Sequence, residues 1–439
     1  MKIVELTKDQ FESFTNTHPL RSHYQTFYYG QLLSEYYFDY NLIGYVDHNN
    51  SIKAASLIVT KRITSIHKYA YAPKGILIDY NDPGLVKSFT RDLKKYLKKK
   101  KIFMLKINPD IIIGEARKEN GYKTVYNINF DIISMLSGFG YLKLKNNLYF
   151  ESQFPRFNTI VHLDQYRGLK NLAKNVRNKV NKSERRGLSL QQGTVDDLEK
   201  FYEFVKDKRS RGIEYYRDYY NLFNKENQID LFLIRVDYEK YLTTAQKRYN
   251  DELSLNESLN NEMQNNPNDK LLARKMQSDR DLASYKNDIL KASKNIHDEN
   301  SIVIAGALVI KYFNRAYILI SGYDQEFKFL SPNYYLHYKI IEHYKSLNFE
   351  FVDLNGMTGD FTKENPYYGL NKFKLGFNDI VYEYIGEFDL VIRKRVYNDL
   401  NNSATLAKEF NKPWVKKGDI NSEGIHISEQ KENQEIEKF

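Results

Sequence analysis

The stretch Asn355 to Asp389 reads NGMTGDFTKENPYYGLNKFKLGFNDIVYEYIGEFD and carries the densest set of structural signals in the 439-residue chain. A glycine-bearing loop comes first, and Phe373 and Lys374 follow it directly before a turn at Gly376. Apolar residues that recur between 380 and 388 then indicate a short strand. A lysine held between aromatic residues beside such a turn is placed to donate to an oxyanion or a phosphate.

This stretch resembles the C-terminal signature of the Fem-type aminoacyltransferases, which move an amino acid from aminoacyl-tRNA onto the stem peptide of a peptidoglycan precursor. Shorter similarities precede it in the same order, at Tyr24-Gln25-Thr26, at 73–80 and at 104–110. The resemblance therefore spans about residues 1 to 395. It implies two α/β halves related to the GNAT acyltransferases, with a helical arm inserted between them.

Composition narrows the classes of function. The chain is 41% apolar, and it has no cysteine for disulfides or for a Cys-ligated metal. The longest apolar run, Ile302 to Ile310, is far shorter than the roughly 20 residues that span a bilayer. We therefore expect a cytoplasmic protein that is soluble or peripheral at the inner face of the membrane. The net charge of +10 favours polyanionic partners, although an AT-rich genome would also enrich lysine.

Short apolar strands and helices alternate on both sides of a central interruption, which is typical of an α/β fold. We expect a first GNAT-like subdomain over 1–155 and a second one built from 156–240 and 300–395. The remaining residues, 396–439, are expected to form a C-terminal helix and a disordered polar tail, since they contain few large apolar side chains.

The interruption, 241–299, contains no glycine, and its apolar residues recur at helical spacing on both sides of a turn around Pro267. This pattern predicts an antiparallel two-helix coiled-coil arm. The segment holds nine Lys/Arg and ten Asp/Glu, so it is close to neutral. Neutrality argues against a simple tRNA-binding surface and is typical of a structural arm or of one that forms a homodimer contact.

Aminoacyl transfer requires an amine to attack an ester, an oxyanion to be stabilised and a proton to leave. The chain has no cysteine, no serine in a nucleophile elbow and no metal-binding helix motif, so we expect no covalent intermediate, metal or other cofactor. The resemblance implies catalytic roles for Lys374, Phe373 and Asp110. Asn108 replaces the first acid of the family pattern near Asp110, which puts a general base there in doubt.

A basic and aromatic cluster lies in the segment KRSRGIEYYRDYY. Arginine suits phosphate because its planar fork donates two hydrogen bonds at once. The segment resembles the family's acceptor-binding region, which faces the diphosphate of lipid II or UDP-MurNAc-pentapeptide. The resemblance implies substrate contacts from Arg209, Arg211, Tyr215 and Arg217, and from Tyr368 in the glycine-bearing loop; a solvated helix end explains the arginines almost as well.

A second basic stretch follows at 169–187, where a narrow apolar stripe predicts an amphipathic helix. Such a helix can lie on tRNA or on an anionic membrane, and a merely solvated basic face is an equal alternative. The residues expected to make the tRNA or membrane contact are Lys170, Lys174, Arg177, Lys182, Arg185 and Arg186.

The function expected from the resemblance is transfer of glycine, serine or alanine from aminoacyl-tRNA to a lipid-linked or UDP-linked precursor, which builds the interpeptide bridge. One alternative is a CoA-dependent GNAT N-acetyltransferase, although the pyrophosphate loop of that class has no match here. The other is a non-catalytic RNA-binding or immunity protein of the same fold. The sequence leaves open which amino acid is carried and which precursor accepts it.

Overall fold

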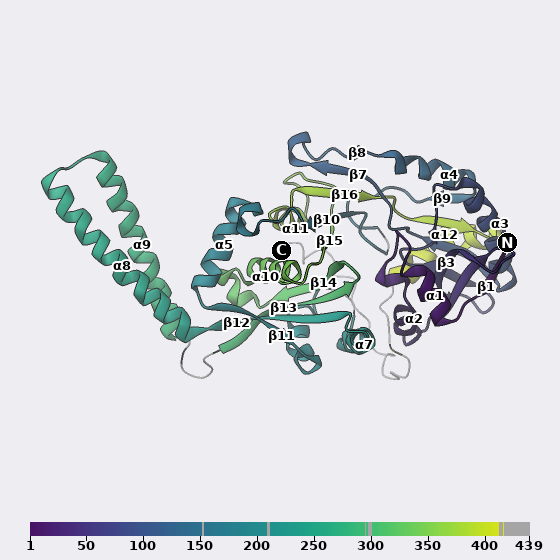
Figure 1. Ribbon diagram of the computed structural model, residues 1–439, viewed down its shortest axis with the longest axis horizontal. Helices are drawn as coiled ribbons and strands as arrows, with labels where there is room; N and C mark the ends of the chain where they lie inside the picture. The colour runs from purple at the N-terminus through teal and green to yellow at the C-terminus, as the bar shows by residue number, and fades with distance from the viewer. Residues whose placement is uncertain (152, 209–210, 295, 297–300, 412–415, 417–439) are drawn as a thin grey trace.

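The computed structural model describes the chain except for residues 152, 209–210, 295, 297–300, 412–415 and 417–439. Two β-sheets with their packed helices lie side by side, and a long helical hairpin extends from the second (Figure 1). Arg209 and the expected polar tail beyond Lys416 fall outside the described residues. Among the described residues, every helix is too short or too polar to span a lipid bilayer.

The first sheet has the strand order β1-β2-β3-β4-β6-β17-β9, with β5 paired to β3. Only β4 and β6 run parallel, and the chain between them forms β5 and helix α3. The strands are β1 (Lys2–Glu5), β2 (Asp39–Val46), β3 (Ile52–Arg62), β4 (Lys68–Ala72), β5 (Leu77–Ile78), β6 (Ile102–Ile107), β9 (Tyr141–Lys143) and β17 (Phe388–Val391). The helices of this half are α1 (Lys8–Thr15), α2 (Phe27–Ser34), α3 (Pro83–Lys99), α4 (Ile132–Gly138), α12 (Lys394–Asn402) and α13 (Thr405–Asn411).

The second sheet has the order β11-β12-β13-β14-β15-β10-β16-β7-β8, and again only one pair, β14 and β15, runs parallel. Its strands are β7 (Ile112–Arg117), β8 (Val125–Tyr126), β10 (Phe157–His162), β11 (Leu188–Gly193), β12 (Ile229–Asp237), β13 (Ser301–Tyr312), β14 (Arg315–Tyr323), β15 (Phe351–Met357) and β16 (Ile380–Tyr384). Its helices are α5 (Lys174–Arg185), α6 (Leu198–Glu203), α7 (Ile213–Asn224), α10 (Pro332–Ser346) and α11 (Tyr368–Lys374).

The two halves repeat one local plan, since each joins its parallel strands through a helix that begins with proline. Proline suits the first helical position because its missing N–H would have no partner there. Helix α3 starts at Pro83 after the N-cap Asp82, and it buries Phe89 and Leu93 against the first sheet. Helix α10 starts at Pro332 and packs on the second sheet in the same way. This repeat agrees with two related α/β halves.

The chain exchanges strands between the halves, which the expected boundary at residue 155 did not anticipate. Strands β7 and β8 come from the first 155 residues but form the edge of the second sheet. Conversely, β17 lies in the first sheet, where it pairs with β6 and β9. The two sheets are therefore tied together by the chain itself, and residues between them come from distant parts of the sequence.

The interruption at 241–299 forms two long helices, α8 (Tyr238–Asn265) and α9 (Asp269–Lys294), which run antiparallel and project away from the sheets (Figure 1). Midway along the hairpin, the buried side-chain amide of Asn256 donates to Ser278 at 3.0 Å. The insert therefore consists of two helices, as expected, and its coiled-coil character stays a prediction.

Candidate active site

The loop after β4 is fixed by the side chain of Gln25. Its Nε2 donates to the carbonyl oxygen of Pro73 at 2.7 Å, and its Oε1 accepts from the backbone N–H of Leu57 at 2.8 Å. A Cβ on Gly75 would lie 2.8 Å from the same Nε2, so a larger residue would displace this anchor. Lys74 is thereby held with a left-handed φ of 53°.

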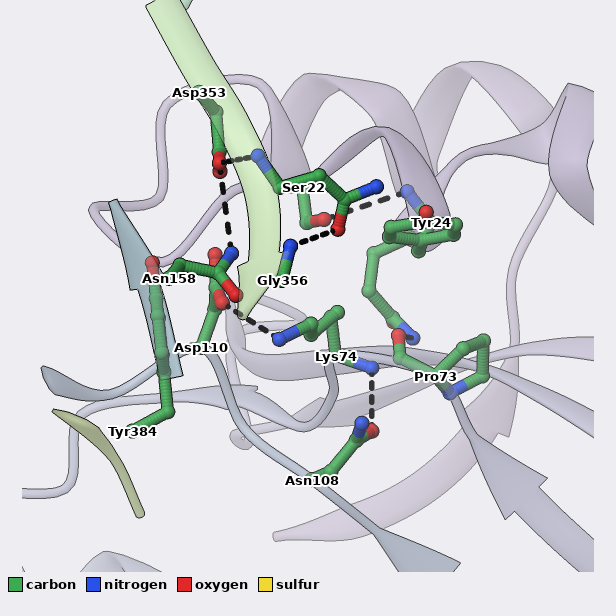
Figure 2. A network of polar contacts seen from close by, with 12 residues as sticks. Ser22, Tyr24, Pro73, Lys74, Asn108, Asp110, Asn158, Asp353, Gly356 and Tyr384 are labelled. Carbon is green, nitrogen blue, oxygen red and sulfur yellow. Dashed lines mark hydrogen bonds and ion pairs between the residues drawn. The ribbon is translucent and has the colours of Figure 1, made fainter. Parts of the chain in front are cut away.

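Asn108, which follows β6, closes the same loop from the other side. Its Oδ1 accepts from the backbone N–H of Lys74 at 2.9 Å (Figure 2). The same oxygen accepts from the hydroxyl of Tyr71 at 3.1 Å. An aspartate here would place a second carboxylate close to Asp110. The asparagine, which follows β6, instead bonds to Tyr71 of β4 and to Lys74 just after it, so it links the ends of these two parallel strands and has a structural role.

A buried ion pair forms where these two strands end. The ammonium of Lys74 lies 3.1 Å from the carboxylate of Asp110, and each side chain is only about a tenth exposed (Figure 2). The rings of Phe154 and Tyr384 lie 5.2 and 4.7 Å from the same ammonium. Burial alone would raise the pKa of Asp110, but the charges of Lys74 and Arg315 outweigh it and hold that pKa below its ordinary value. Asp110 is therefore an ionised carboxylate at neutral pH.

A second ion pair from the other sheet faces the first. Arg315, at the start of β14, donates to Asp353 of β15 at 2.5 Å and to the hydroxyl of Tyr384 at 3.2 Å. Asp353 also accepts from the side-chain amide of Asn158 at 3.5 Å and from the backbone N–H of Asn355 at 2.7 Å. The junction of the two sheets thus brings together two cations and two carboxylates whose side chains are at most 18% exposed.

A small cavity of about 30 Å³ lies at this junction. Its volume suffices for a water-sized group, and polar atoms from both sheets surround it. The residues that line it are Ser22, Tyr24, Lys74, Asp110, Phe154, Pro155, Asn158, Tyr317, Leu319, Asp353 and Asn355.

His23 packs beside the cavity, with its ring 4.6 Å from that of Tyr317. Burial lowers the pKa of His23 to about 3, and neither ring nitrogen has a hydrogen-bond partner within the described part of the chain. The imidazole is therefore neutral at physiological pH.

Lys374 is held just beside this junction. Its Nζ donates to the carbonyl oxygen of Gly356, the residue after Asn355, and only 7% of Lys374 is exposed. Helix α11 is tied to the loop after β15 because the Asn371 amide exchanges two hydrogen bonds with the backbone of Thr358. Phe373 packs against the rings of Tyr334, His337 and Phe377. Lys374 does not itself line the small cavity; Gly356 connects it to the residues that do.

A larger cleft adjoins the cavity and shares Tyr24, Phe154 and Leu319 with it. Its walls are mostly aromatic, with the cationic side chains of Lys61 and Arg211 among them. The guanidinium of Arg211 lies 5.6 Å from the ring of Tyr215, which also lines the cleft. The remaining wall residues are Tyr29, Leu33, Phe38, Val59, Tyr69, Tyr71, Gln153, Tyr216, Ile320, Glu409 and Phe410.

The expected substrate-binding set is only partly brought together. Arg211 and Tyr215 share the cleft, but Arg217 does not line it. Its guanidinium pairs with Glu214 and, at 3.2 Å, with Glu199, outside the cleft that contains Arg211 and Tyr215. Tyr368 lies elsewhere, in a separate groove.

That groove, of about 710 Å³, runs between helix α11 and the start of α5. Lys118 and Lys372 supply positive charge along it. Tyr122 and Phe361 stack on its wall with their ring centres 4.4 Å apart. Stacked aromatics beside lysines form the kind of surface that binds single-stranded nucleic acid.

Helix α5 confirms the expected helix within 169–187, and its residues Val176 and Val180 are fully buried. Lys170, Lys174, Lys182 and Arg185 are exposed and Arg177 is half-buried, so they remain available at the surface near the groove. Arg186 is different, because it is 6% exposed and pairs with Asp288 of α9 at 2.5 Å. Unlike the exposed cations of this segment, Arg186 lies at the base of the hairpin, so its expected tRNA or membrane contact stays a prediction.

Several residues of the junction were not identified from the sequence as site residues: Lys74, Asn158, Arg315, Asp353 and His23. Asn158, Arg315 and Asp353 are single polar residues in apolar strands, and no local motif distinguishes them from exposed strand residues. Lys74 lies within the family-like stretch 73–80 and His23 directly precedes Tyr24-Gln25-Thr26, but neither side chain was singled out. The signal that could have found Asp353 is its place within the apolar run of β15, where a charge needs a buried partner. Across the described residues, no group of three or more His, Cys, Asp or Glu is placed to hold a metal ion.

Known proteins share this architecture. Residues 6–404 match the FemAB family. Aminoacyltransferase FemA from Staphylococcus aureus (strain bovine RF122 / ET3-1) is 25% identical over 419 residues, which cover 90% of this chain and 97% of that protein. The same protein from strain N315 gives the same values. The crystal structure of FemX shares the fold, with a TM-score of 0.68 at 19% identity over 91% of this chain and 100% of that one. With a family match over nearly its whole length, the chain belongs to the FemAB family.

Proposed function

We propose that this protein transfers an amino acid from aminoacyl-tRNA to the stem-peptide amine of a peptidoglycan precursor. The observation that carries the proposal is the charged junction between the sheets, which adjoins an aromatic, arginine-bearing cleft on one flank and lies close to a basic groove on another. A reaction with two large substrates requires two separate surfaces that meet at one point. The similarity to FemA, an aminoacyltransferase, supports the same chemistry.

The cleft is the better surface for the acceptor. Its walls combine Arg211 and Lys61 with many aromatic rings, so they suit a diphosphate joined to sugars. The cleft leads to the small cavity through their shared residues Tyr24 and Phe154. A precursor bound by its diphosphate would extend its peptide amine toward Asp110.

The groove is the better surface for the acyl donor. Lys118, Lys372 and the exposed cations of α5 attract phosphates, and Tyr122 and Phe361 offer rings to bases. Helix α11 lines this groove and carries Lys374 at its end. The aminoacyl ester at the end of the tRNA would therefore lie near Lys374.

The chemistry is direct aminolysis. The amine nitrogen attacks the ester carbonyl carbon, the new C–N bond forms, the bond to the ribose oxygen breaks, and that oxygen leaves with a proton. Lys374 has three N–H donors, so it can hold the Gly356 carbonyl and also stabilise the oxyanion. Asp110 orients the incoming amine as a hydrogen-bond acceptor. Its lowered pKa makes it a weak base, so the proton leaves through the ribose oxygen or water.

The proposal is tested by mass spectrometry of muropeptides from cells with and without this protein. Loss of the protein should remove one or more bridge residues from the stem peptides, and the mass difference identifies the amino acid. A strain that carries Lys374→Met should give the same shortened bridge. Unchanged muropeptides in the deletion strain would overturn the proposed function.

A further inference from the structure

The C-terminal helix α13 forms part of the wall of the acceptor cleft. Leu406, Glu409 and Phe410 follow the i, i+3, i+4 spacing of a single helix face, and all three are buried or partly buried. Glu409 and Phe410 line the cleft together with Arg211 and Tyr215. The face of α13 that points inward therefore occupies space next to the residues proposed to bind the precursor.

The inward carboxylate meets the second cation of the cleft. Glu409 lies 2.9 Å from the ammonium of Lys61, and their side chains are 7% and 21% exposed. Phe410 secures the contact, with its ring 5.1 Å from that of Tyr69 and also 5.1 Å from the ammonium of Lys106. An anion is thus already placed against Lys61, inside a cleft whose other cation is Arg211.

We propose that Lys61 and Arg211 form the diphosphate site of the cleft and that Glu409 on α13 is its internal competitor. The inference rests on the proposed function only for the identity of the natural ligand. Glu409 brings one negative charge to Lys61, whereas a diphosphate brings more charge and several acceptor oxygens. A diphosphate should therefore displace the carboxylate, and α13 should leave the cleft with it.

Helix α13 is suited to this movement. It has seven residues, and a helix this short is not stable without the surface on which it packs. Ala404, between α12 and α13, has a left-handed φ of 56°, so the chain turns sharply where the helix would hinge. Beyond α13, Lys416 pairs with Asp218 of α7 at 2.8 Å, so this end of the chain contacts both halves.

The test measures binding of two soluble diphosphates to the full chain by calorimetry, namely UDP and geranyl diphosphate, with uridine as the ligand without phosphate. Glu409→Gln keeps the size of the side chain and removes the competing charge, so the Kd for diphosphate should fall about tenfold, the equivalent of one charge-assisted contact. Lys61→Gln should raise the Kd at least tenfold. In the double variant the gain from Glu409→Gln should disappear, because the carboxylate acts through Lys61.

The matched control is Glu203→Gln, which removes a carboxylate from an exposed ion pair with Lys206 of similar length, 2.8 Å, outside the cleft. It should leave the Kd unchanged. Hydrogen exchange should report α13 directly, since added diphosphate should speed exchange across 405–411 in the wild type. Binding of UDP, of geranyl diphosphate or of both supports the site, and the pattern identifies a nucleotide-linked or lipid-linked acceptor.

The inference is overturned if Glu409→Gln leaves diphosphate affinity unchanged or weaker, or if Lys61→Gln binds as the wild type does. These readouts need no acyl transfer. Diphosphate binding that depends on Lys61 and Glu409 in a protein without transferase activity would therefore sustain this inference while the proposed function fails. If the protein is an active transferase but its diphosphate affinity does not depend on Lys61 or Glu409, the proposed function holds and this inference fails.

Discussion

Lys374 combines a buried side chain, a hydrogen bond to the carbonyl oxygen of Gly356 and a place beside the charged junction. Replacement by methionine keeps the length of the side chain and removes its charge. We expect Lys374→Met to lower kcat about 100-fold or more, the effect of losing one oxyanion donor. The melting temperature and the affinity for both substrates should change little. Turnover near that of the wild type would remove Lys374 from the mechanism.

Arg211 and Arg217 are six residues apart but have different surroundings, which makes them a matched pair. Arg211→Ala should raise the KM for the precursor about 10- to 150-fold, because a charge-assisted phosphate contact is worth roughly 1.5–3 kcal/mol. Arg217→Ala should leave KM near its original value, since its guanidinium is engaged by Glu214 and Glu199. On a precursor analogue without the diphosphate, the Arg211 defect should vanish; its persistence would assign Arg211 to the fold.

His23 should contribute to the loss of folding stability at acidic pH. Burial holds its folded pKa at about 3, below the ordinary 6.5, so the folded state favours the neutral ring. Its contribution is complete above about pH 6.5 and declines as the pH falls toward 3, at up to about 1.4 kcal/mol per pH unit. His23→Phe should reduce this slope in denaturant unfolding measured between pH 7 and pH 4. An unchanged slope would contradict the buried, neutral imidazole.

Individual site residues were predictable only where a motif surrounds them. Lys374 and Asp110 could be named because the stretches that contain them resemble family segments. Arg315 and Asp353 could not, because what marks them is their contact with each other across two parallel strands, and they are 38 residues apart in the chain. Arg217 matched the family segment by spacing alone. Spacing does not show that its guanidinium pairs with Glu214 and Glu199 and lies outside the cleft.

At the level of elements, the cations of the basic segment 169–187 have two kinds of surroundings. The exposed cations lie along α5, whereas Arg186 lies just past its end and is paired with Asp288 of α9. The same carboxylate accepts from the hydroxyl of Tyr241 at 2.9 Å. The cations near the groove are therefore different residues from the cation that pairs with the helical hairpin.

This division predicts different outcomes for neighbouring substitutions. The double variant Lys174→Ala, Arg177→Ala should reduce the slope of log affinity for tRNA against log salt by about 2, one for each lost phosphate contact. Arg186→Ala should instead destabilise the protein by up to about 3 kcal/mol, because it leaves a largely buried carboxylate, 13% exposed, without its cation. Filter binding across a salt series and denaturant unfolding separate the two effects; an unaltered salt slope in the double variant would exclude α5 from the tRNA surface.

The elements themselves were largely readable from sequence. The hairpin was evident because a long segment without glycine repeats apolar residues at helical spacing around one turn. The exchange of β7, β8 and β17 between the sheets was not, because alternation of apolar residues identifies a strand without identifying its neighbours. The docking of α13 in the cleft was equally hidden, since seven residues of mixed polarity carry no signal of the surface they cover.

At the scale of the whole molecule, two related halves meet at a junction that neither could form alone. Lys74 and Asp110 come from the ends of the parallel strands in the first sheet, and Arg315 and Asp353 come from the parallel pair of the second. The exchanged strands hold these ends in contact. A fold assembled this way can present one surface to each of two substrates and still keep the reacting groups together.

The most direct test is a single-turnover assay with enzyme in excess, in which labelled aminoacyl-tRNA and the precursor are mixed and the labelled precursor is measured. We expect transfer of the amino acid from glycyl-, seryl- or alanyl-tRNA to the stem peptide, with loss of the signal in Lys374→Met. Acetyl-CoA as the acyl donor should give no product. Acetylation from acetyl-CoA without any transfer from the three charged tRNAs would contradict the account.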